Sequence, residues 1–166
     1  VGLQPLIAQD KLLPVYHFQR VNGLFSNQIR SRAVRDVEGF VWIGTINGLE
    51  RFDGYSVKDY RNVTDDPYSL SSNYIPALLL DKKQRLWVGT YDTGLSLYDR
   101  ATDRFFNLLP RSGDTTWYQA KTIARMLEDR HGNLWLASRF GGVVRMELPT
   151  GARTKNPDSL LSRIRF

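Results

Sequence analysis

Short runs of apolar residues, each ended by a glycine, an aspartate or another polar residue, recur along the chain. The runs are too short for ordinary helices and are rich in β-branched and aromatic residues, so they predict β-strands. They form three groups, which longer polar connections separate. The predicted strands are 29–34, 40–45, 49–52 and 56–60 in the first group, 75–80, 85–90, 95–98 and 104–109 in the second, and 123–127, 133–138, 143–148 and one near Arg153 in the third.

The three groups are copies of one sequence unit. In each copy an aspartate precedes a tryptophan by six residues, and Trp42, Trp87 and Trp135 follow one another after 45 and 48 residues. A period of roughly 40 to 50 residues made of short strands is typical of β-propeller blades, and a blade contains four antiparallel strands. The sequence therefore predicts an all-β fold, a partial β-propeller of three four-stranded blades with a strand fragment at each end.

The boundaries of the units follow from the repeat. Residues 156–162 match 66–72, so a further repeat begins there. The predicted division is a lead segment at 1–14 and a partial propeller at 15–166, with blades at about 28–62, 74–110 and 122–155 and the start of a further repeat at 156–166. Closed propellers have four to eight blades. Three blades leave two apolar faces uncovered, so we expect either a longer chain or self-association through the open blade faces.

Three residue types in the repeat have predicted structural roles. The tryptophans can be stacking platforms for a ligand, but their identical place in every copy favours burial between adjacent blades. Gly44 and Gly89 follow them and predict a close backbone approach at this point. Asp36, Asp81 and Asp129 are expected to end the first strand of each copy and to accept hydrogen bonds from turn backbone.

Composition narrows the functional classes. The chain has no cysteine, which excludes disulfides and thiolate metal sites. Its net charge is +6, but Lys and Arg are dispersed and alternate with apolar residues, which indicates solvated strand faces and no nucleic-acid partner. No run approaches the ~20 apolar residues of a membrane span. The first residues lack Met and a basic segment, so the start is either a mature N-terminus after removal of a leader, which we favour, or an arbitrary boundary.

The sequence contains no recognisable catalytic motif. The two histidines, His17 and His131, have no partner at metal-ligand spacing, and neither a nucleophile elbow nor a phosphate-binding loop is found. Asp65 and Asp66 are adjacent on a connection, which indicates a turn and not two carboxylates facing each other across a cleft. We predict no catalytic residue, no metal site and no cofactor. A propeller lyase or glycosidase stays an alternative, because its active residues would come from several blades.

The repeat resembles a known family. Its second copy, from Leu70-Ser-Ser-Asn-Tyr-Ile75 through Leu86-Trp-Val-Gly-Thr90 to Gly94-Leu-Ser-Leu-Tyr-Asp99, is similar to the two-component regulator propeller repeat. Residues 39–54 are similar to the first repeat of such sensors. The third copy departs from the pattern, with Ala137-Ser138 in place of Gly-Thr.

The resemblance implies a function. It implies a periplasmic, ligand-sensing and non-catalytic segment of a membrane-spanning bacterial signalling protein, whose output is a histidine kinase, often a hybrid one, or a diguanylate cyclase. The implied ligand is an oligosaccharide or another small molecule, and membrane contact would come only through parts of the parent protein outside this chain. A protein-docking or scaffold propeller is the alternative.

Ligand contacts are expected from loops at one rim of the propeller. By the order of strands in a blade, the loops between second and third strands lie at the same rim as the connections between blades. The predicted ligand-binding residues are Asn47, Tyr91, Asp92, Arg139 and Phe140 in the first set of loops and Trp117 and Tyr118 in the second. Aromatic rings can stack on a sugar or planar ligand while Asp92 or Arg139 fixes its orientation. The alternative, that these are ordinary solvated turn residues, stays open.

Overall fold

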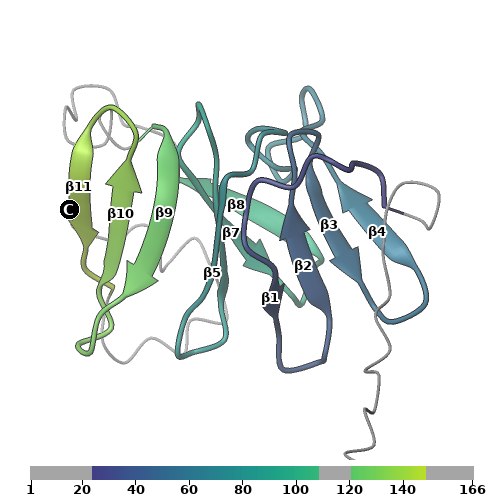
Figure 1. Ribbon diagram of the computed structural model, residues 1–166, viewed down its shortest axis with the longest axis horizontal. Coiled ribbons are helices and arrows are strands. Elements are labelled where there is room, and N and C mark those ends of the chain that lie inside the picture. The colour runs from purple at the N-terminus through teal and green to yellow at the C-terminus, as the bar shows by residue number, and fades with distance from the viewer. Residues whose placement is uncertain (1–23, 109–120, 149–166) are drawn as a thin grey trace, which may run out of the picture.

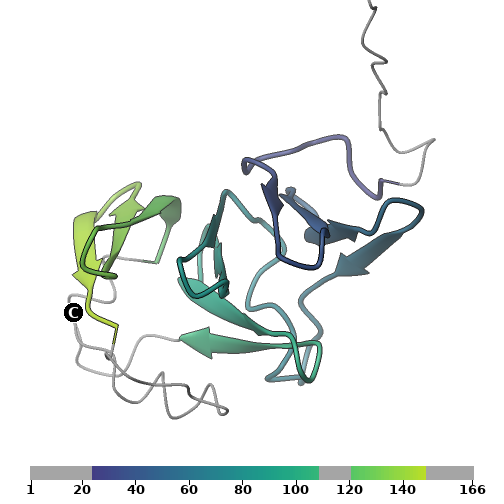
Figure 2. The ribbon, with the colours of Figure 1, turned by 90° about the horizontal axis from the view of Figure 1, so that it is seen from below.

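The computed structural model describes residues 24–108 and 121–148, which form three antiparallel β-sheets. The sheets stand side by side in sequence order, as Figures 1 and 2 show. Within each sheet the chain runs back and forth, so strands that are neighbours in sequence are neighbours in space. No described residue lies in a helix, and the described part therefore has no helix long and apolar enough to cross a membrane. The all-β prediction is confirmed.

Each sheet corresponds to one copy of the repeat. The first blade contains β1 (Val34–Arg35), β2 (Val41–Gly44), β3 (Leu49–Phe52) and β4 (Val57–Tyr60). The second contains β5 (Ala77–Leu80), β6 (Leu86–Gly89), β7 (Leu95–Asp99) and β8 (Arg104–Leu108). The third contains β9 (Ile123–Glu128), β10 (Leu134–Ser138) and β11 (Gly142–Met146). The fourth strand predicted near Arg153 lies outside the described residues, as do both predicted end fragments.

The first strand of the first blade is shorter than predicted. The sequence predicted 29–34, whereas β1 covers only Val34–Arg35. Ahead of β1, the backbone amides of Arg30 and Ser31 both donate to the Gly44 carbonyl, at 2.9 and 3.2 Å, and the Ser31 hydroxyl accepts from the Gly44 amide at 2.8 Å. A side chain thus takes the place of a ladder carbonyl and interrupts the strand, an effect that apolar periodicity does not reveal.

Adjacent blades come close where the repeat has its Gly-Thr pair. A Cβ atom on Gly44 would lie 2.5 Å from the carbonyl oxygen of Ile75 in the next blade. The amide of Ile75 donates to the Thr45 carbonyl at 2.8 Å, and the amide of Ile123 donates to the Thr90 carbonyl at 2.9 Å. The absence of a side chain at this glycine lets one blade hydrogen-bond to the segment that leads into the next, which confirms the predicted close approach.

The second blade is buried on both faces. One apolar core lies between the first and second blades and includes Trp42 and Val88. Another lies between the second and third blades and includes Trp87 and Leu136. Because both faces of the second blade are covered, β5 and β6 are continuous apolar runs and do not alternate with polar residues.

The repeated aspartates bind both the turn and the tryptophan. The indole Nε1 donates to the carboxylate six residues earlier in every copy: Trp42 to Asp36 at 2.8 Å, Trp87 to Asp81 at 2.9 Å and Trp135 to Asp129 at 3.0 Å. Asp81 also accepts from the backbone amides of Lys83 and Arg85, each at 2.9 Å, which confirms the predicted turn contacts. In the third copy the bond from Trp135 and those from Asn133 and His131 hold the pKa of Asp129 well below its usual range.

Burial of the tryptophans differs in the third blade. Trp42 and Trp87 are 1% and 0% exposed, as predicted, but Trp135 is 36% exposed, so the prediction was wrong there. Trp135 pairs across the sheet with Leu127, and Val143 pairs with Ala137, two residues along β10. These side chains point away from the second blade, and Val143 is 63% exposed. We call Leu127, Trp135 and Val143 the open face of the third blade.

A polar cluster joins the first and second blades. Asp103, in the turn before β8, accepts from the hydroxyls of Tyr60 and Tyr98, both at 2.7 Å, and pairs with Lys58. Burial raises the pKa of Asp103, but the hydrogen bonds from Lys58, Tyr98 and Tyr60 outweigh it and hold the pKa below its usual value. Burial, and then the bond to this carboxylate, raises the pKa of Tyr98 to about 12. The cluster fixes how the two blades sit against each other.

Candidate functional site

An open pocket lies at the rim where the three blades meet. Its volume is about 330 Å³, within the ~300–1,000 Å³ typical of small-molecule sites. We call it the rim pocket, and its lining residues are Arg30, Tyr74, Pro76, Tyr91, Thr122, Ala124, Arg125 and Arg139. They come from the segments that lead into β1, β5 and β9, from β9 itself, and from the loops between second and third strands of the second and third blades. The two kinds of loop therefore do share one rim.

Two tyrosines form one wall of the rim pocket. The rings of Tyr74 and Tyr91 stack with 4.8 Å between centroids and 7° between planes. The Tyr91 amide donates to the Tyr74 carbonyl at 3.1 Å, so the backbone also holds the pair together. Both tyrosines line the pocket, so a sugar or another flat group bound there can pack against this aromatic wall.

Arg139 is held at the rim by its backbone and by a neighbouring ring. Its amide donates to the Thr122 carbonyl at 2.9 Å, which joins the β10–β11 loop to the segment before β9. Its guanidinium carbon lies 5.6 Å from the centroid of the Phe140 ring, a cation–π distance. Phe140 thus orients Arg139 and does not itself line the pocket.

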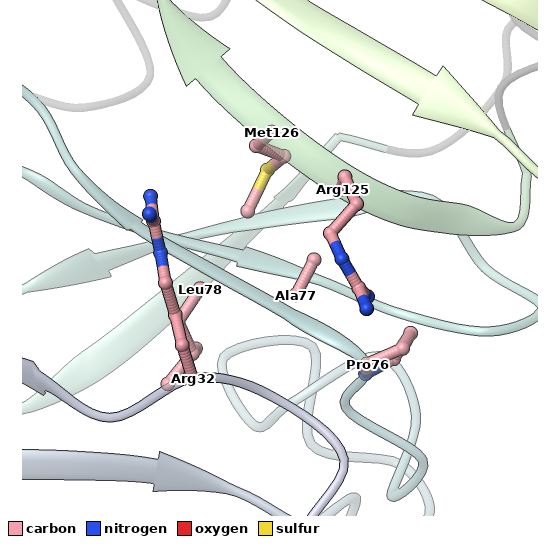
Figure 3. A pocket seen from close by; sticks show the side chains of 6 residues that line it. All are labelled: Arg32, Pro76, Ala77, Leu78, Arg125 and Met126. Carbon is pink, nitrogen blue, oxygen red and sulfur yellow. The ribbon is translucent and has the colours of Figure 1, made fainter.

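A second pocket of about 200 Å³ adjoins the first. We call it the inner pocket, and it is lined by Arg32, Pro76, Ala77, Leu78, Arg125 and Met126. Figure 3 shows Arg32, which precedes β1, and Arg125, on β9, on either side of the segment that carries Pro76 and Ala77. Pro76 and Arg125 line both pockets, so a ligand in one is in reach of residues of the other.

Arginine gives both pockets a positive charge. Arg30, Arg32, Arg125 and Arg139 line them, and no acidic residue of the described part of the chain does. Elsewhere in the described ranges, arginines commonly pair with carboxylates, as do Arg51, Arg61, Arg85, Arg100 and Arg145. None of the four pocket arginines forms an ion pair with an acidic side chain of residues 24–108 or 121–148. Uncompensated charge in a hollow attracts anions.

The predicted ligand-binding residues separate into four sets. Tyr91 and Arg139 come together in the rim pocket. Asn47 and Asp92 are exposed but line neither pocket, and the Asn47 amide donates to the Thr45 hydroxyl at 3.0 Å within its own turn. Phe140 lies beside Arg139, as described. Trp117 and Tyr118 lie outside the described residues.

Three lining residues, Arg30, Tyr74 and Arg125, were not among the predicted ligand-binding residues. Arg30 and Arg125 fall within the predicted strands 29–34 and 123–127, and Tyr74 lies in the connection before the predicted strand 75–80. Of these three, only Tyr74 has a counterpart in the repeat, because Ile75 and Ile123 make the same hydrogen bond to the preceding blade. The residues just before them, Tyr74 and Thr122, therefore occupy one repeat position at the rim.

The arginines of the two pockets suit binding of an anion and not removal of a proton. Guanidinium groups donate hydrogen bonds and stay protonated in proteins, so they cannot act as a general base. Among the described residues, no group of three or more His, Cys, Asp or Glu is placed to hold a metal ion. Asp65 and Asp66 form a turn, in which Asp65 has a φ of 67° and Asp66 accepts from the Tyr68 amide at 3.0 Å.

Comparison with known sequences supports the resemblance seen in the repeat. The model of the two-component regulator propeller family matches residues 69–92. A curated relative, histidine kinase P4 of Formosa agariphila, is 34% identical over 67 residues, which are 38% of this chain and 5% of the relative. The chain thus spans a small part of that protein.

Solved structures show the same arrangement of strands. A protein from B. thetaiotaomicron, described as the extracellular domain of a hybrid two-component system, aligns with a TM-score of 0.71 at 22% identity, over 78% of this chain and 18% of that one. A second domain of this description from the same organism has a TM-score of 0.59 at 34% identity, over 72% of this chain and 16% of that one. Together with the family match, these alignments confirm the predicted partial propeller.

Proposed function

Because this chain belongs to the two-component regulator propeller family, we propose that it is a ligand-sensing segment of an extracellular domain in a membrane-spanning bacterial signalling protein. The observation that carries this proposal is the 34% identity, over 72% of the chain, with the extracellular domain of a hybrid two-component system. The segment binds and does not catalyse. Its location is the periplasm, and the output is a histidine kinase, as in the curated relative, with a diguanylate cyclase as the alternative.

The rim pocket is the proposed ligand site. A ligand that contacts both Tyr91 and Arg139 touches the second and third blades at once. It therefore stabilises one arrangement of these blades relative to another, and such a shift can be passed to an output domain. A ligand drives the shift only through a difference in its affinity for the two arrangements.

The location can be tested apart from the ligand. Alkaline phosphatase folds into an active enzyme only outside the cytoplasm, where its disulfides form. Fused after this segment in the full-length protein, it should be active in intact cells. A fusion that is inactive there, although it accumulates to a normal level, would contradict the proposed location.

The signalling role can be tested in the full-length protein with a reporter gene and a panel of neutral and acidic oligosaccharides. We expect Tyr91→Ala combined with Arg139→Gln to abolish or strongly weaken the response to the oligosaccharide that activates the unmodified protein. The matched control is Tyr55→Ala combined with Arg104→Gln, which changes an exposed tyrosine and an exposed arginine outside both pockets. An unchanged response in the first variant would remove this rim from consideration.

Docking of a protein is the second candidate function, and the open face of the third blade favours it. Exposed apolar faces of this kind mark interaction sites. If docking is the function, Val143→Lys should abolish capture of the partner by the full-length protein, while Tyr91→Ala combined with Arg139→Gln should not. If sensing is the function, Tyr91→Ala combined with Arg139→Gln should weaken the response to a ligand, while Val143→Lys should not.

A further inference from the structure

We infer that the rim pocket and the inner pocket together bind an acidic carbohydrate. The arginines hold its carboxylate or sulfate groups, and the tyrosine pair packs against a sugar ring. This inference rests on the proposed function for its biological role and names the chemical class of the ligand that the same site takes. Four observations carry it: the charge of the pockets, its lack of compensation, the free donors of the arginines, and the aromatic wall.

Positive charge converges on the pockets from separate parts of the chain. Arg30 and Arg32 precede β1 in the first blade, whereas Arg125 lies on β9 and Arg139 on the β10–β11 loop of the third blade. The fold, and not a cluster in the sequence, brings them together. Guanidinium groups that line adjoining pockets repel one another, and a bound anion removes that repulsion.

The arginines retain hydrogen-bond donors for such an anion. Each guanidinium has five N–H donors. Arg30 uses one on the Gln28 side chain at 3.4 Å, and Arg125 uses one on the carbonyl of its neighbour Ala124 at 2.7 Å. The planar fork of a guanidinium matches the paired oxygens of a carboxylate or sulfate, which it binds through two parallel hydrogen bonds.

The rest of the lining points to a sugar and not to a free inorganic anion. An inorganic sulfate or phosphate ion would use the arginines alone. The Tyr74–Tyr91 wall adds an aromatic surface, and Thr122 adds a hydroxyl, in the same pocket. A charged ring with several hydroxyl groups uses all three kinds of contact.

Binding can be measured by calorimetry on the full-length protein with three probes. These are tetragalacturonate, its methyl ester, which keeps the shape and removes the charge, and a chondroitin sulfate tetrasaccharide. We expect at least one of the two acidic probes to bind, with an affinity that falls as salt is raised. If the groups held are carboxylates, the methyl ester should bind roughly tenfold more weakly than tetragalacturonate. Binding of only the sulfated probe would identify sulfate as the group held.

The variant that tests the site is Arg30→Gln combined with Arg139→Gln, which removes two charges and leaves shorter but still polar side chains. We expect it to weaken binding of the acidic probe by roughly tenfold or more. The matched control, Arg104→Gln combined with Arg130→Gln, removes two exposed arginines outside the pockets and leaves the net charge the same as in the first variant. Thermal unfolding of both variants shows whether each is folded.

Three outcomes would overturn the inference: no binding of either acidic probe, binding of the methyl ester as tight as that of tetragalacturonate, or an equal loss of affinity in the variant and the control. The proposed function can fail separately. A protein that binds the acidic probe but gives no signalling response has the site without the sensor role. A protein that responds to a neutral oligosaccharide, and responds equally well after Arg30→Gln combined with Arg139→Gln, is a sensor that does not use this site.

Discussion

A single buried carboxylate in the first blade shows how one residue can make folding depend on pH. Glu50 lies on β3 and is 1% exposed. Its Oε1 accepts from the Ser26 amide at 2.9 Å, whereas Oε2 has no hydrogen-bond partner in the described structure. Burial raises the pKa of Glu50, the bonds from backbone amides oppose this, and Asp59, opposite it on β4, adds to the rise.

Glu50→Gln should therefore change the pH dependence of stability. A raised folded-state pKa means that the native state holds the proton more firmly than the unfolded chain, whose glutamate has a pKa of about 4.3. The stability that protonated Glu50 contributes is fully present below that value and is lost as pH rises through the folded pKa. Urea unfolding should show Glu50→Gln gaining stability relative to the unmodified protein between about pH 4 and pH 7.

Asp53→Asn is the opposite-sign control. Backbone hydrogen bonds from Ser56 and Tyr55 lower the pKa of Asp53, so its contribution is lost only as pH falls below the unfolded value of about 3.9. The loss of unfolding free energy caused by Asp53→Asn should therefore stay level between about pH 4 and pH 7 and become smaller in stronger acid. A stability difference for Glu50→Gln that does not vary with pH would contradict the assigned pKa shift.

The bond between aspartate and tryptophan should matter most where it is buried. Asp81→Ala leaves the Trp87 indole and the turn amides without their acceptor in a fully buried site. We expect a loss of about 2–4 kcal/mol of unfolding free energy in chemical denaturation. Asp129→Ala should cost less, because Trp135 is partly exposed and water can replace the carboxylate. Equal costs would show that the indole bond is not the source of the difference.

Among the elements, Asp103 joins β4 of the first blade to β7 of the second. Its carboxylate receives hydrogen bonds from β4 and β7, so Asp103→Asn weakens contacts between blades and not only within a turn. About 1 kcal/mol should be lost, a modest figure because the side chain is one-third exposed and water screens its charge. Asp99→Asn, at the end of β7, is the control, since within the described residues its carboxylate accepts hydrogen bonds from the β7–β8 turn. An equal loss from both would place the effect in the turn.

The bounds of a strand could be predicted from the sequence where the apolar pattern alone determines them. β3 has its predicted bounds, and β5 to β8 differ from theirs by one or two residues, because apolar runs bounded by turn residues leave little choice. β1 was not predictable, because the Ser31 hydroxyl competes with the ladder there. Such competition depends on a partner, Gly44, that only the folded register supplies.

At the scale of the whole molecule, some residues of the rim pocket could be predicted from the sequence and others could not. Topology places the loops between second and third strands at one rim, so Tyr91 and Arg139 could be selected from the sequence. Arg30 and Arg125 could not, because their place depends on how the first strands of different blades approach one another. Tyr91 faces a pocket, whereas Asp92 faces solvent. Packing decides this difference, and the periodicity of the sequence does not reveal it.

The blades also differ in how completely they are covered. Equivalent positions in the repeat are Leu95 and Val143, and Trp87 and Trp135, as the paired strands show. Leu95 and Trp87 are fully buried by the third blade, whereas Val143 and Trp135 remain exposed. The open face therefore has the composition of a blade interface, although no blade formed by the described residues covers it, and burying it would remove apolar surface from water.

We expect the 166-residue chain, studied by itself, to associate with further copies through this face, with a mass in light scattering that rises with concentration. Leu127→Lys combined with Val143→Lys places two charges on the face and should restore the monomer mass. The control, Val37→Lys combined with Val63→Lys, adds the same charges at apolar residues of similar exposure, in the β1–β2 turn and the β4–β5 connection, and should leave association unchanged. A monomer at every concentration would contradict the proposal, and so would an equal effect of both variants, which would indicate a response to net charge and not to this face.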